Sequence, residues 1–485
     1  MEELDIATIT KRSIHGVFAL VSRTFIISIF SLVINLLLGI YLSPAVFGVY
    51  ALVTAAIAFL QYFSDIGLAG ALIQKKTDLT QTDLSTTFII QQCLMITAII
   101  VALLLTPVIS RFYHFNRSEM YLLDAVIISF FLSSLKTIPS VMLERNLRFE
   151  KLVIPQVVET FVFGLTAFVC AVMGLGVNSF TFAVLARGLL GLIAMYIVCP
   201  WFPTFSFSKD VAKRLLSFGV PFQLNSFLAL VKDDLFLAYV GKVLPLAQIG
   251  YITFAQKWAF VPLRLVMDNV IRITFSSFSR LQHDPKHLGR AVEKSLFTLA
   301  LLIFPSLVGL VILAPLFMQI IPKYQKWEPA LFSLGLFAAN AALSSFSTPL
   351  TNALNAIGKI KVTLYLMIFW VIATWVITPI MIFIYGFNGV SIASVIIALS
   401  SVGVVVITKK YIAFRVLPAV TIPFASSLVM GGIVYFLSTR LPVNLFSIVI
   451  MIVVGMVSYF SVVLALARGE FIADLKIIKI QLLKR

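Results

Sequence analysis

Charged residues are scarce in this sequence. Only 12% of its 485 residues are Asp, Glu, Lys or Arg, whereas 60% are hydrophobic and the mean hydropathy is +1.05. A soluble domain carries about 25% charged and roughly 45–50% apolar residues. The chain therefore has too little charge to cover a water-facing surface, which excludes both a soluble globular protein and a disordered one.

Residues that bind metals or form disulfides are also few. The three cysteines, Cys93, Cys170 and Cys199, lie in apolar runs, and the four histidines are scattered. Neither set has the spacing of a metal site or of a disulfide framework. The sequence has no P-loop motif, and its first 30 residues lack the basic segment of a cleavable signal. We therefore expect no metal and no cofactor, and the remaining class is a polytopic helical membrane protein.

Long apolar runs divide the chain into fourteen expected membrane spans. A bilayer core of ~30 Å needs roughly 20 apolar residues at a helical rise of about 1.5 Å per residue. A tight turn at Tyr385–Gly389 separates two of the spans, because Gly and Asn tolerate turn backbone. By this length criterion the expected spans cover residues 20–42, 46–71, 84–107, 119–140, 152–174, 177–199, 215–240, 246–278, 295–320, 329–356, 361–385, 388–408, 418–438 and 443–466.

The distribution of Lys and Arg predicts the orientation. When loops are assigned alternately to the two sides, one side receives 24 basic residues and the other receives 6, with 7 inside spans. Cytoplasmic loops carry an excess of Lys and Arg, so both termini are expected in the cytoplasm. The net charge of +17 then mostly reflects the basic residues that orient the chain in the membrane, and it does not indicate a surface that binds nucleic acid. Loops on the outer side are short, which argues against an external enzymatic domain.

Weak internal similarity suggests a repeat. Gly48 and Gly250 lie 202 positions apart in similar Gly-containing segments, and Asp65 and Asp268 lie 203 apart. Six spans separate the repeats, so they run in parallel, as in transporters built from two lobes. The expected organisation is an N-lobe (1–200), a cytoplasmic linker (201–214), a C-lobe (215–408), and two extra helices with a basic tail (409–485).

Ionisable residues inside the expected spans occur only in the first eight. Each costs at least ~2.5–3.5 kcal/mol near the bilayer centre and normally faces protein or water. In the span 246–278 the charged residues form the clearest pattern. Successive helical residues are rotated by about 100°, so the four charged residues of this span lie on one face of the helix. These residues are Lys257, Arg264, Asp268 and Arg272. The face is either an anion-binding stripe or a self-neutralising ladder of i,i+4 pairs.

The span 215–240 carries three adjacent charges, Lys232, Asp233 and Asp234. Adjacent helical residues point in different directions, so we expect Lys232 to neutralise one aspartate while the other reaches the lobe interface. The pair is either a site for a coupling H⁺ or Na⁺ or a structural salt bridge.

Three further charged residues stand alone within or beside expected spans. Arg23 and Arg187 are isolated arginines that either line a cavity or meet a structural partner. Asp65 is expected near the cytoplasmic rim, as a structural cap or a functional group.

Several segments resemble one family of membrane proteins. Ser64–Lys75, Leu143–Lys151 and Asp234–Gly241 are similar to landmarks of Wzx-type bacterial polysaccharide and O-antigen flippases. Phe275–Gln282 and Lys326–Ala330 match later landmarks, although Ser276 stands where many relatives have proline. The resemblance covers roughly residues 20–365 and identifies the chain as a member of the multidrug/oligosaccharidyl-lipid/polysaccharide flippase superfamily.

This resemblance implies that the protein is a transporter and not an enzyme. Such proteins move polyprenyl-diphosphate-linked oligosaccharides from the inner to the outer leaflet of the bacterial inner membrane by alternating access, alongside other polysaccharide-assembly proteins. A cationic cavity suits a diphosphate, since guanidinium pairs two oxygens at once. The alternatives are a multidrug/cation antiporter or a peptidoglycan-precursor flippase on the same scaffold, or a membrane-embedded glycosyltransferase or ligase.

Overall fold

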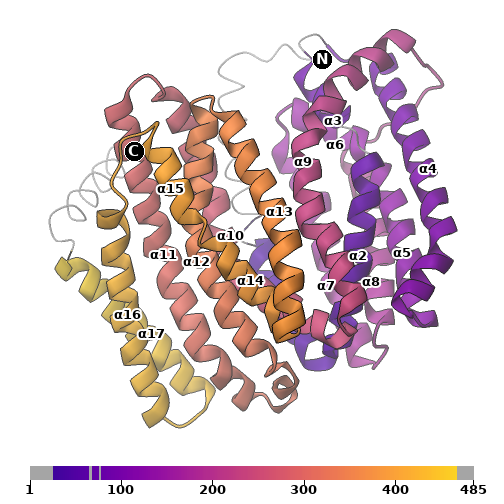
Figure 1. Cartoon of the computed structure of the whole chain (residues 1–485). Coiled ribbons are helices and arrows are strands. Elements are labelled where there is room, and N and C mark those ends of the chain that lie inside the picture. Colours follow the sequence, from indigo (N-terminus) through magenta and orange to yellow (C-terminus); the bar gives the residue numbers. More distant parts are fainter. Residues whose placement is uncertain (1–23, 25, 65–67, 76–77, 467–485) are drawn as a thin grey trace. The chain divides into compact units, whose positions relative to one another are not determined.

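The structure of the chain is a computed structural model that describes residue 24 and residues 26–64, 68–75 and 78–466. Among these residues the regular structure is helical and no strand occurs. A first helix covers Ile26–Tyr41. The elements that follow, most of them labelled in Figure 1, are α2 (Pro44–Ser64), α3 (Leu68–Gln74), α4 (Gln81–Tyr113), α5 (Arg117–Ser134), α6 (Thr137–Arg145), α7 (Phe149–Val172), α8 (Asn178–Val198), α9 (Lys209–Val243), α10 (Leu246–Arg280), α11 (Pro285–Ile320), the 3₁₀ turn η1 (Pro322–Trp327), α12 (Ala330–Ala356), α13 (Ile360–Tyr385), α14 (Asn388–Ala398), α15 (Ser401–Lys409), α16 (Leu417–Arg440) and α17 (Leu445–Leu466).

Each of the fourteen expected spans coincides with helix in the described part of the chain. Nine helical segments there are long and apolar enough to cross a bilayer, α14 and α15 counting together as Asn388–Lys409. Helices α5 and α6 together are also long and apolar enough, with a bend of 42° between them. The other expected spans coincide with the helix Ile26–Tyr41, with α2 and α3, and with α9 and α10, which are 35 residues long and carry charges. The expected all-helical, multi-pass fold is confirmed.

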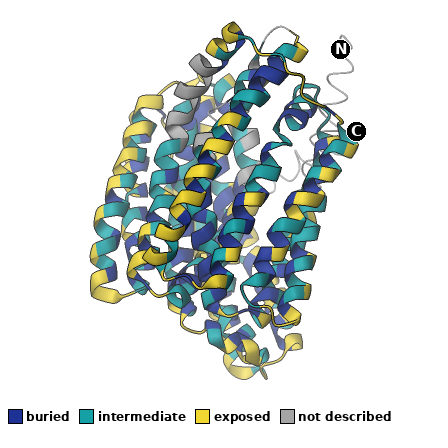
Figure 2. Cartoon of the chain, turned by 90° about the vertical axis from the view of Figure 1, so that its right-hand side faces the viewer, coloured by how far each residue is buried: buried dark blue, intermediate teal, exposed yellow. Residues whose placement is uncertain are grey.

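The helices expose large apolar side chains along their outer faces. Leu104 is 71% exposed, Ile197 76% and Phe383 91%. Figure 2 shows exposed residues repeating along helices whose opposite faces are buried. In water such apolar surfaces would promote aggregation. In a bilayer they can face the lipid directly, because the backbone polar groups of a helix form hydrogen bonds within the helix.

The chain forms two compact units, Met1–Gly250 and Tyr251–Arg485. In the first unit α7 packs along α8, α5 packs on α8, and α9 packs on α2, α3 and α4. In the second unit α11 packs against α12 and α16, and α16 packs against α17. This division falls inside α10 rather than at the linker, because the contacts of α9 are with the first helices. The lobe boundaries inferred from the sequence stay a prediction.

Local signals place two of the helix boundaries. The turn expected at Tyr385–Gly389 is confirmed: α13 ends at Tyr385, Gly386 has a φ of +61°, and α14 begins at Asn388. The positive φ explains why glycine stands there. Helix α9 begins at Lys209, within the expected linker 201–214, because the Ser208 hydroxyl accepts a hydrogen bond from the Val211 N–H and caps the helix.

The two glycines of the internal repeat meet in the first unit. Each is the fifth residue of its helix, Gly48 in α2 and Gly250 in α10. A Cβ atom on Gly48 would overlap the carbonyl oxygen of Leu246, and one on Gly250 would overlap that of Pro44. Pro44 and Leu246 are also 202 positions apart. The contact is therefore reciprocal, and the absence of side chains lets the two backbones touch, as small residues do between membrane helices.

Candidate functional site

Six of the ten charged residues singled out in the sequence are described with their side chains. Arg23 and Asp65 lie outside the described residues. Asp268 and Arg272 lie on α10, but their side chains are outside the described part. The six others fall in three places: Lys257 and Arg264 on α10, Lys232, Asp233 and Asp234 on α9, and Arg187 on α8.

Helix α10 separates an apolar face from a basic one. Its buried residues Ile252, Ala255, Ala259 and Leu263 recur every three or four positions and form one stripe. Lys257 and Arg264 lie seven positions apart, so they share a direction about 135–155° away from the centre of that stripe, on the side of the helix that also carries the buried Phe254. Both are exposed. Two cations about 10 Å apart along the axis thus lie on one face of a helix that is expected to span the membrane.

An aromatic cluster in the second unit fixes the start of α10. Phe254, one turn before Lys257, stacks on Trp327 with ring centroids 4.0 Å apart. Trp327 is fully buried and belongs to the Lys326–Ala330 segment that carried part of the family resemblance. Tyr324 of η1 also packs on Phe254, and burial raises the pKa of its phenol. The family segment therefore acts as a support that holds the turn carrying Lys257.

The three charges of α9 are not equivalent. The Lys232 ammonium lies 2.8 Å from an Asp233 carboxylate oxygen, and 63% of the Asp233 side chain is exposed. Asp234 points elsewhere, since adjacent helical residues differ by about 100°, and it is half-buried. Lys232 thus pairs with Asp233, and Asp234 is the carboxylate with a separate environment.

Arg187 belongs to a cluster of charged residues that was not predicted from the sequence. Glu159 on α7 pairs with Lys136, which lies between α5 and α6, and its other oxygen is 3.7 Å from the Arg187 Nε. Exposure of the three side chains differs: 11% for Lys136, 15% for Glu159 and 51% for Arg187. One carboxylate thus faces two cations, and the guanidinium keeps an open side.

The packing around this cluster reserves space for the carboxylate. Gly191 on α8 lies against Glu159, and a Cβ atom there would overlap the carboxylate group. Lys136 and Glu159 were visible in the sequence as intramembrane charges, but they are 23 residues apart on different elements. Helical periodicity relates only neighbours on one helix, so it gave no signal of this pair.

Glu159→Gln is expected to lower the yield and thermal stability of the folded protein. Removing one partner of this partly buried ion pair leaves an uncompensated charge; the cost is about 3–5 kcal/mol for a fully buried pair and is expected to be smaller here. A second substitution, Lys136→Met, should recover much of this loss. Arg187→Gln is the matched control, because its exposed side chain makes only the longer contact and its loss should change the unfolding temperature little. A Glu159→Gln protein as stable as wild type would contradict the pairing.

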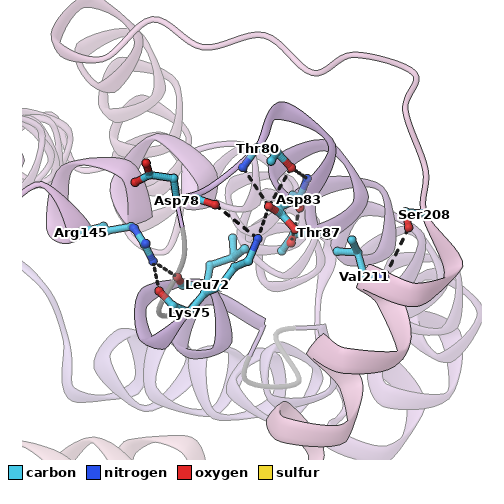
Figure 3. Close-up of polar contacts among 9 residues, drawn as sticks. All are labelled: Leu72, Lys75, Asp78, Thr80, Asp83, Thr87, Arg145, Ser208 and Val211. Carbon is cyan, nitrogen blue, oxygen red and sulfur yellow. Dashed lines mark hydrogen bonds and ion pairs between the residues drawn. The ribbon is translucent and has the colours of Figure 1, made fainter. Parts of the chain in front are cut away.

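Two of the segments that carried the resemblance contact each other at the end of the first unit. Figure 3 shows the Arg145 guanidinium, from α6, donating hydrogen bonds to the carbonyl oxygens of Leu72 and Lys75, at 2.9 and 2.7 Å. These carbonyls end α3, so the arginine caps that short helix. The Lys75 ammonium lies 2.5 Å from Asp83, which also forms a capping box with Thr80 at the start of α4.

The connector between α8 and α9 is tied to the same end of α4. Gln81 exchanges hydrogen bonds with Trp201 and Phe202, and the Thr86 hydroxyl accepts one from the Ser208 N–H. The start of α4 thus meets the end of α3 through the Lys75–Asp83 ion pair and the connector through these hydrogen bonds. In the described part of the chain, no group of three potential metal ligands occurs.

Comparison with known proteins identifies a family to which the chain is similar. Residues 37–331 match the model of a family described as "Polysaccharide biosynthesis protein". An uncharacterized membrane protein in the cps region of Klebsiella pneumoniae is 25% identical over 331 residues, 66% of each chain. The teichuronic acid biosynthesis protein TuaB of Bacillus subtilis is 25% identical over 63% of each chain. The lipopolysaccharide biosynthesis protein WzxC of Escherichia coli is 21% identical over 67% of this chain and 65% of its own length. The chain thus covers just under two thirds of each of these relatives.

Solved structures agree on the fold. The lipid II flippase MurJ, in an inward closed conformation, superposes with a TM-score of 0.76 at 17% identity, covering 93% of this chain and 99% of MurJ. An inward-facing multidrug resistance MATE family transporter of the MOP superfamily gives a TM-score of 0.62 at 15% identity, covering 78% of this chain and 94% of its own. The resemblance drawn from the sequence segments is confirmed, and the chain belongs to the polysaccharide biosynthesis protein family of multi-pass membrane proteins.

Proposed function

We propose that the protein is a flippase that moves polyprenyl-diphosphate-linked oligosaccharide repeat units from the inner to the outer leaflet by alternating access. The observation that carries the proposal is the exposed pair Lys257 and Arg264 on one face of α10, a helix that is expected to span the membrane. Two cations on one face of the helix give that face a positive potential, which favours an anionic substrate. Two relatives are proteins of teichuronic acid and lipopolysaccharide biosynthesis, which supports a glycan-linked cargo.

In this proposal the substrate diphosphate contacts Lys257 and Arg264. Arginine suits a diphosphate because its planar fork pairs two oxygens, and lysine supplies a compact charge. Arg272 and Asp268 would form the ion pair nearer the cytoplasm. An inside-negative membrane potential would assist export, since moving one negative charge outward gains ~2.3 kcal/mol per 100 mV.

The proposed setting is the bacterial inner membrane with both termini in the cytoplasm. The support is the 24-to-6 distribution of basic residues between alternate loops. Reporter fusions after Asn116 and Lys326 should therefore read periplasmic, and a fusion after Gln81 should read cytoplasmic. A cytoplasmic reading at Lys326 would contradict the assignment of loops.

The aspartates of α9 are proposed to have different roles. Asp233 is paired with Lys232 and exposed, so Asp233→Asn should leave transport within about twofold of wild type. Asp234 has a separate environment and is the candidate for coupling H⁺ or Na⁺, so Asp234→Asn should lower transport at least tenfold. The measurement is transport at matched protein levels. Equal, complete loss in both variants would contradict the distinction.

Deletion of the gene in its own host tests the proposed reaction against its alternatives. Loss of a flippase should leave complete lipid-linked oligosaccharide in the membrane, beyond the reach of a membrane-impermeant label added outside. Loss of a glycosyltransferase or ligase would instead shorten the oligosaccharide or leave it labelled but untransferred. A cation antiporter would change drug sensitivity alone. The MurJ fold makes a peptidoglycan precursor the second candidate cargo, so lipid II should be followed in the same strain.

A further inference from the structure

One end of the second unit carries a concentrated basic surface. It is formed by the last residue of α10, the first turns of α11, the turn between α12 and α13, and the end of α15 with the residues that follow. A buried apolar cluster that includes Phe278, Leu288, Ala353 and Ile412 joins these segments. Nine lysines and arginines on them are exposed: Arg280, Lys286, Arg290, Lys294, Lys359, Lys361, Lys409, Lys410 and Arg415.

Few acidic groups offset this charge among the described residues of that end. Asp284 caps α11 and lies 2.6 Å from the His287 ring. Glu293 is less exposed and accepts a hydrogen bond from the backbone N–H of Arg415, at 2.6 Å. Both carboxylates thus already have intramolecular partners, and the surface stays strongly positive.

The described residues of the first unit form no comparable basic surface on the side with the same predicted topology. Its described loops and helix ends there expose four basic residues, Lys151, Lys209, Lys213 and Arg214, and three acidic residues, Asp78, Glu150 and Asp210. Orientation by positive charge applies equally to both units. It therefore explains a basic excess on that side, but it does not explain why, among the described residues, the exposed excess lies mainly on the second unit.

Exposed apolar side chains lie among the basic ones. Ile360, 56% exposed, separates Lys359 from Lys361, and Tyr411, 43% exposed, follows Lys410. The Lys359 ammonium lies 5.0 Å from the centre of the Tyr411 ring. Long basic side chains beside exposed apolar groups are typical of a membrane interface, where the stems lie along hydrocarbon and the charges meet headgroups.

We infer that this basic face binds the anionic phospholipid headgroups of the leaflet it adjoins. The inference does not depend on the transported substrate. Charge complementarity selects the occupant: a negatively charged leaflet attracts basic segments close to the membrane, and each Lys or Arg near the surface contributes roughly fivefold in affinity. The first unit, whose described residues on that side expose nearly balanced charge, should have a weaker preference.

The test uses the full-length purified protein and two matched triple variants. One variant is Lys359→Gln/Lys409→Gln/Lys410→Gln, and the control is Lys209→Gln/Lys213→Gln/Arg214→Gln, which removes the same charge from the first unit. Retained phosphatidylglycerol and phosphatidylcholine are counted by native mass spectrometry, and stabilisation by each lipid is followed by thermal unfolding. Wild type should prefer phosphatidylglycerol, and the preference should fall with added salt.

The expected difference between the variants is large. Loss of three lysines from the basic face should weaken phosphatidylglycerol binding on the order of 100-fold, whereas the control should lose less than about fivefold. Equal losses in both variants would show that only net charge matters and would overturn the inference. So would a wild-type protein that has no preference for phosphatidylglycerol, or whose preference is unchanged in 0.5 M salt; these wild-type measurements decide the matter even where a variant folds poorly.

Discussion

Replacing Lys257 or Arg264 with Ala is expected to reduce transport of a lipid-linked oligosaccharide at least tenfold without loss of folded protein. Both side chains are exposed and lie opposite the buried stripe of α10, so their removal leaves no cavity in the core. A charge-assisted hydrogen bond to a phosphate contributes about 1.5–3 kcal/mol, which corresponds to roughly 10- to 150-fold. The measurement is flipping by purified variants at equal protein density.

Conservative variants separate charge from packing at these positions. Lys257→Arg and Arg264→Lys keep the positive charge, so each should retain more activity than the corresponding Ala variant. Arg264→Lys should be the weaker of the two, because lysine cannot pair two phosphate oxygens at once. Full activity of both Ala variants would refute the anion-binding stripe and favour the self-neutralising ladder on α10.

A methyl group on either repeat glycine is expected to destabilise the protein strongly. In Gly48→Ala and Gly250→Ala the new Cβ atom meets a backbone carbonyl of the opposite helix, which cannot rotate away as a side chain can. The helices would have to separate, and such overpacking costs about 1–3 kcal/mol for each change. Thermal unfolding in lipid should show a lower midpoint for both variants.

Gly309→Ala is the control for this prediction. Gly309 lies inside α11, and no atom lies within 4 Å of the position of an added Cβ. Alanine has the higher helix propensity, so this variant should be unchanged or more stable by up to about 1 kcal/mol. If Gly48→Ala and Gly250→Ala behave like Gly309→Ala, the close contact between the first turns of α2 and α10 does not exist.

The sequence was informative about the fold because the bilayer imposes one length on every span. Apolar runs of about 20 residues predicted fourteen helical segments. One of the breaks between these runs predicted the turn at Gly386. Boundaries near polar caps were less accurate. Helix α9 starts at Lys209 because Ser208 caps it, and the flanking polar sequence resembled a linker.

Relations within one helix were predictable, whereas relations between helices were not. The 100° rotation per residue placed Lys257 and Arg264 on one face of α10, and it separated Asp233 from Asp234. Arg187 remained an isolated charge in the sequence, since Glu159 and Lys136 reach it from other elements. Gly48 and Gly250 were recognised as repeat-related, but their contact depends on how α2 and α10 cross.

The most direct test of the proposed function is flipping by the purified protein in liposomes. A polyprenyl-diphosphate-linked oligosaccharide is placed in both leaflets, and an enzyme outside the vesicles modifies the sugars that it can reach. Empty liposomes should allow modification of about half of the lipid, whereas liposomes with wild-type protein should allow nearly all of it, faster when the potential drives negative charge toward the enzyme. Accessibility that stays at one half with folded wild-type protein, under every potential, would contradict the account.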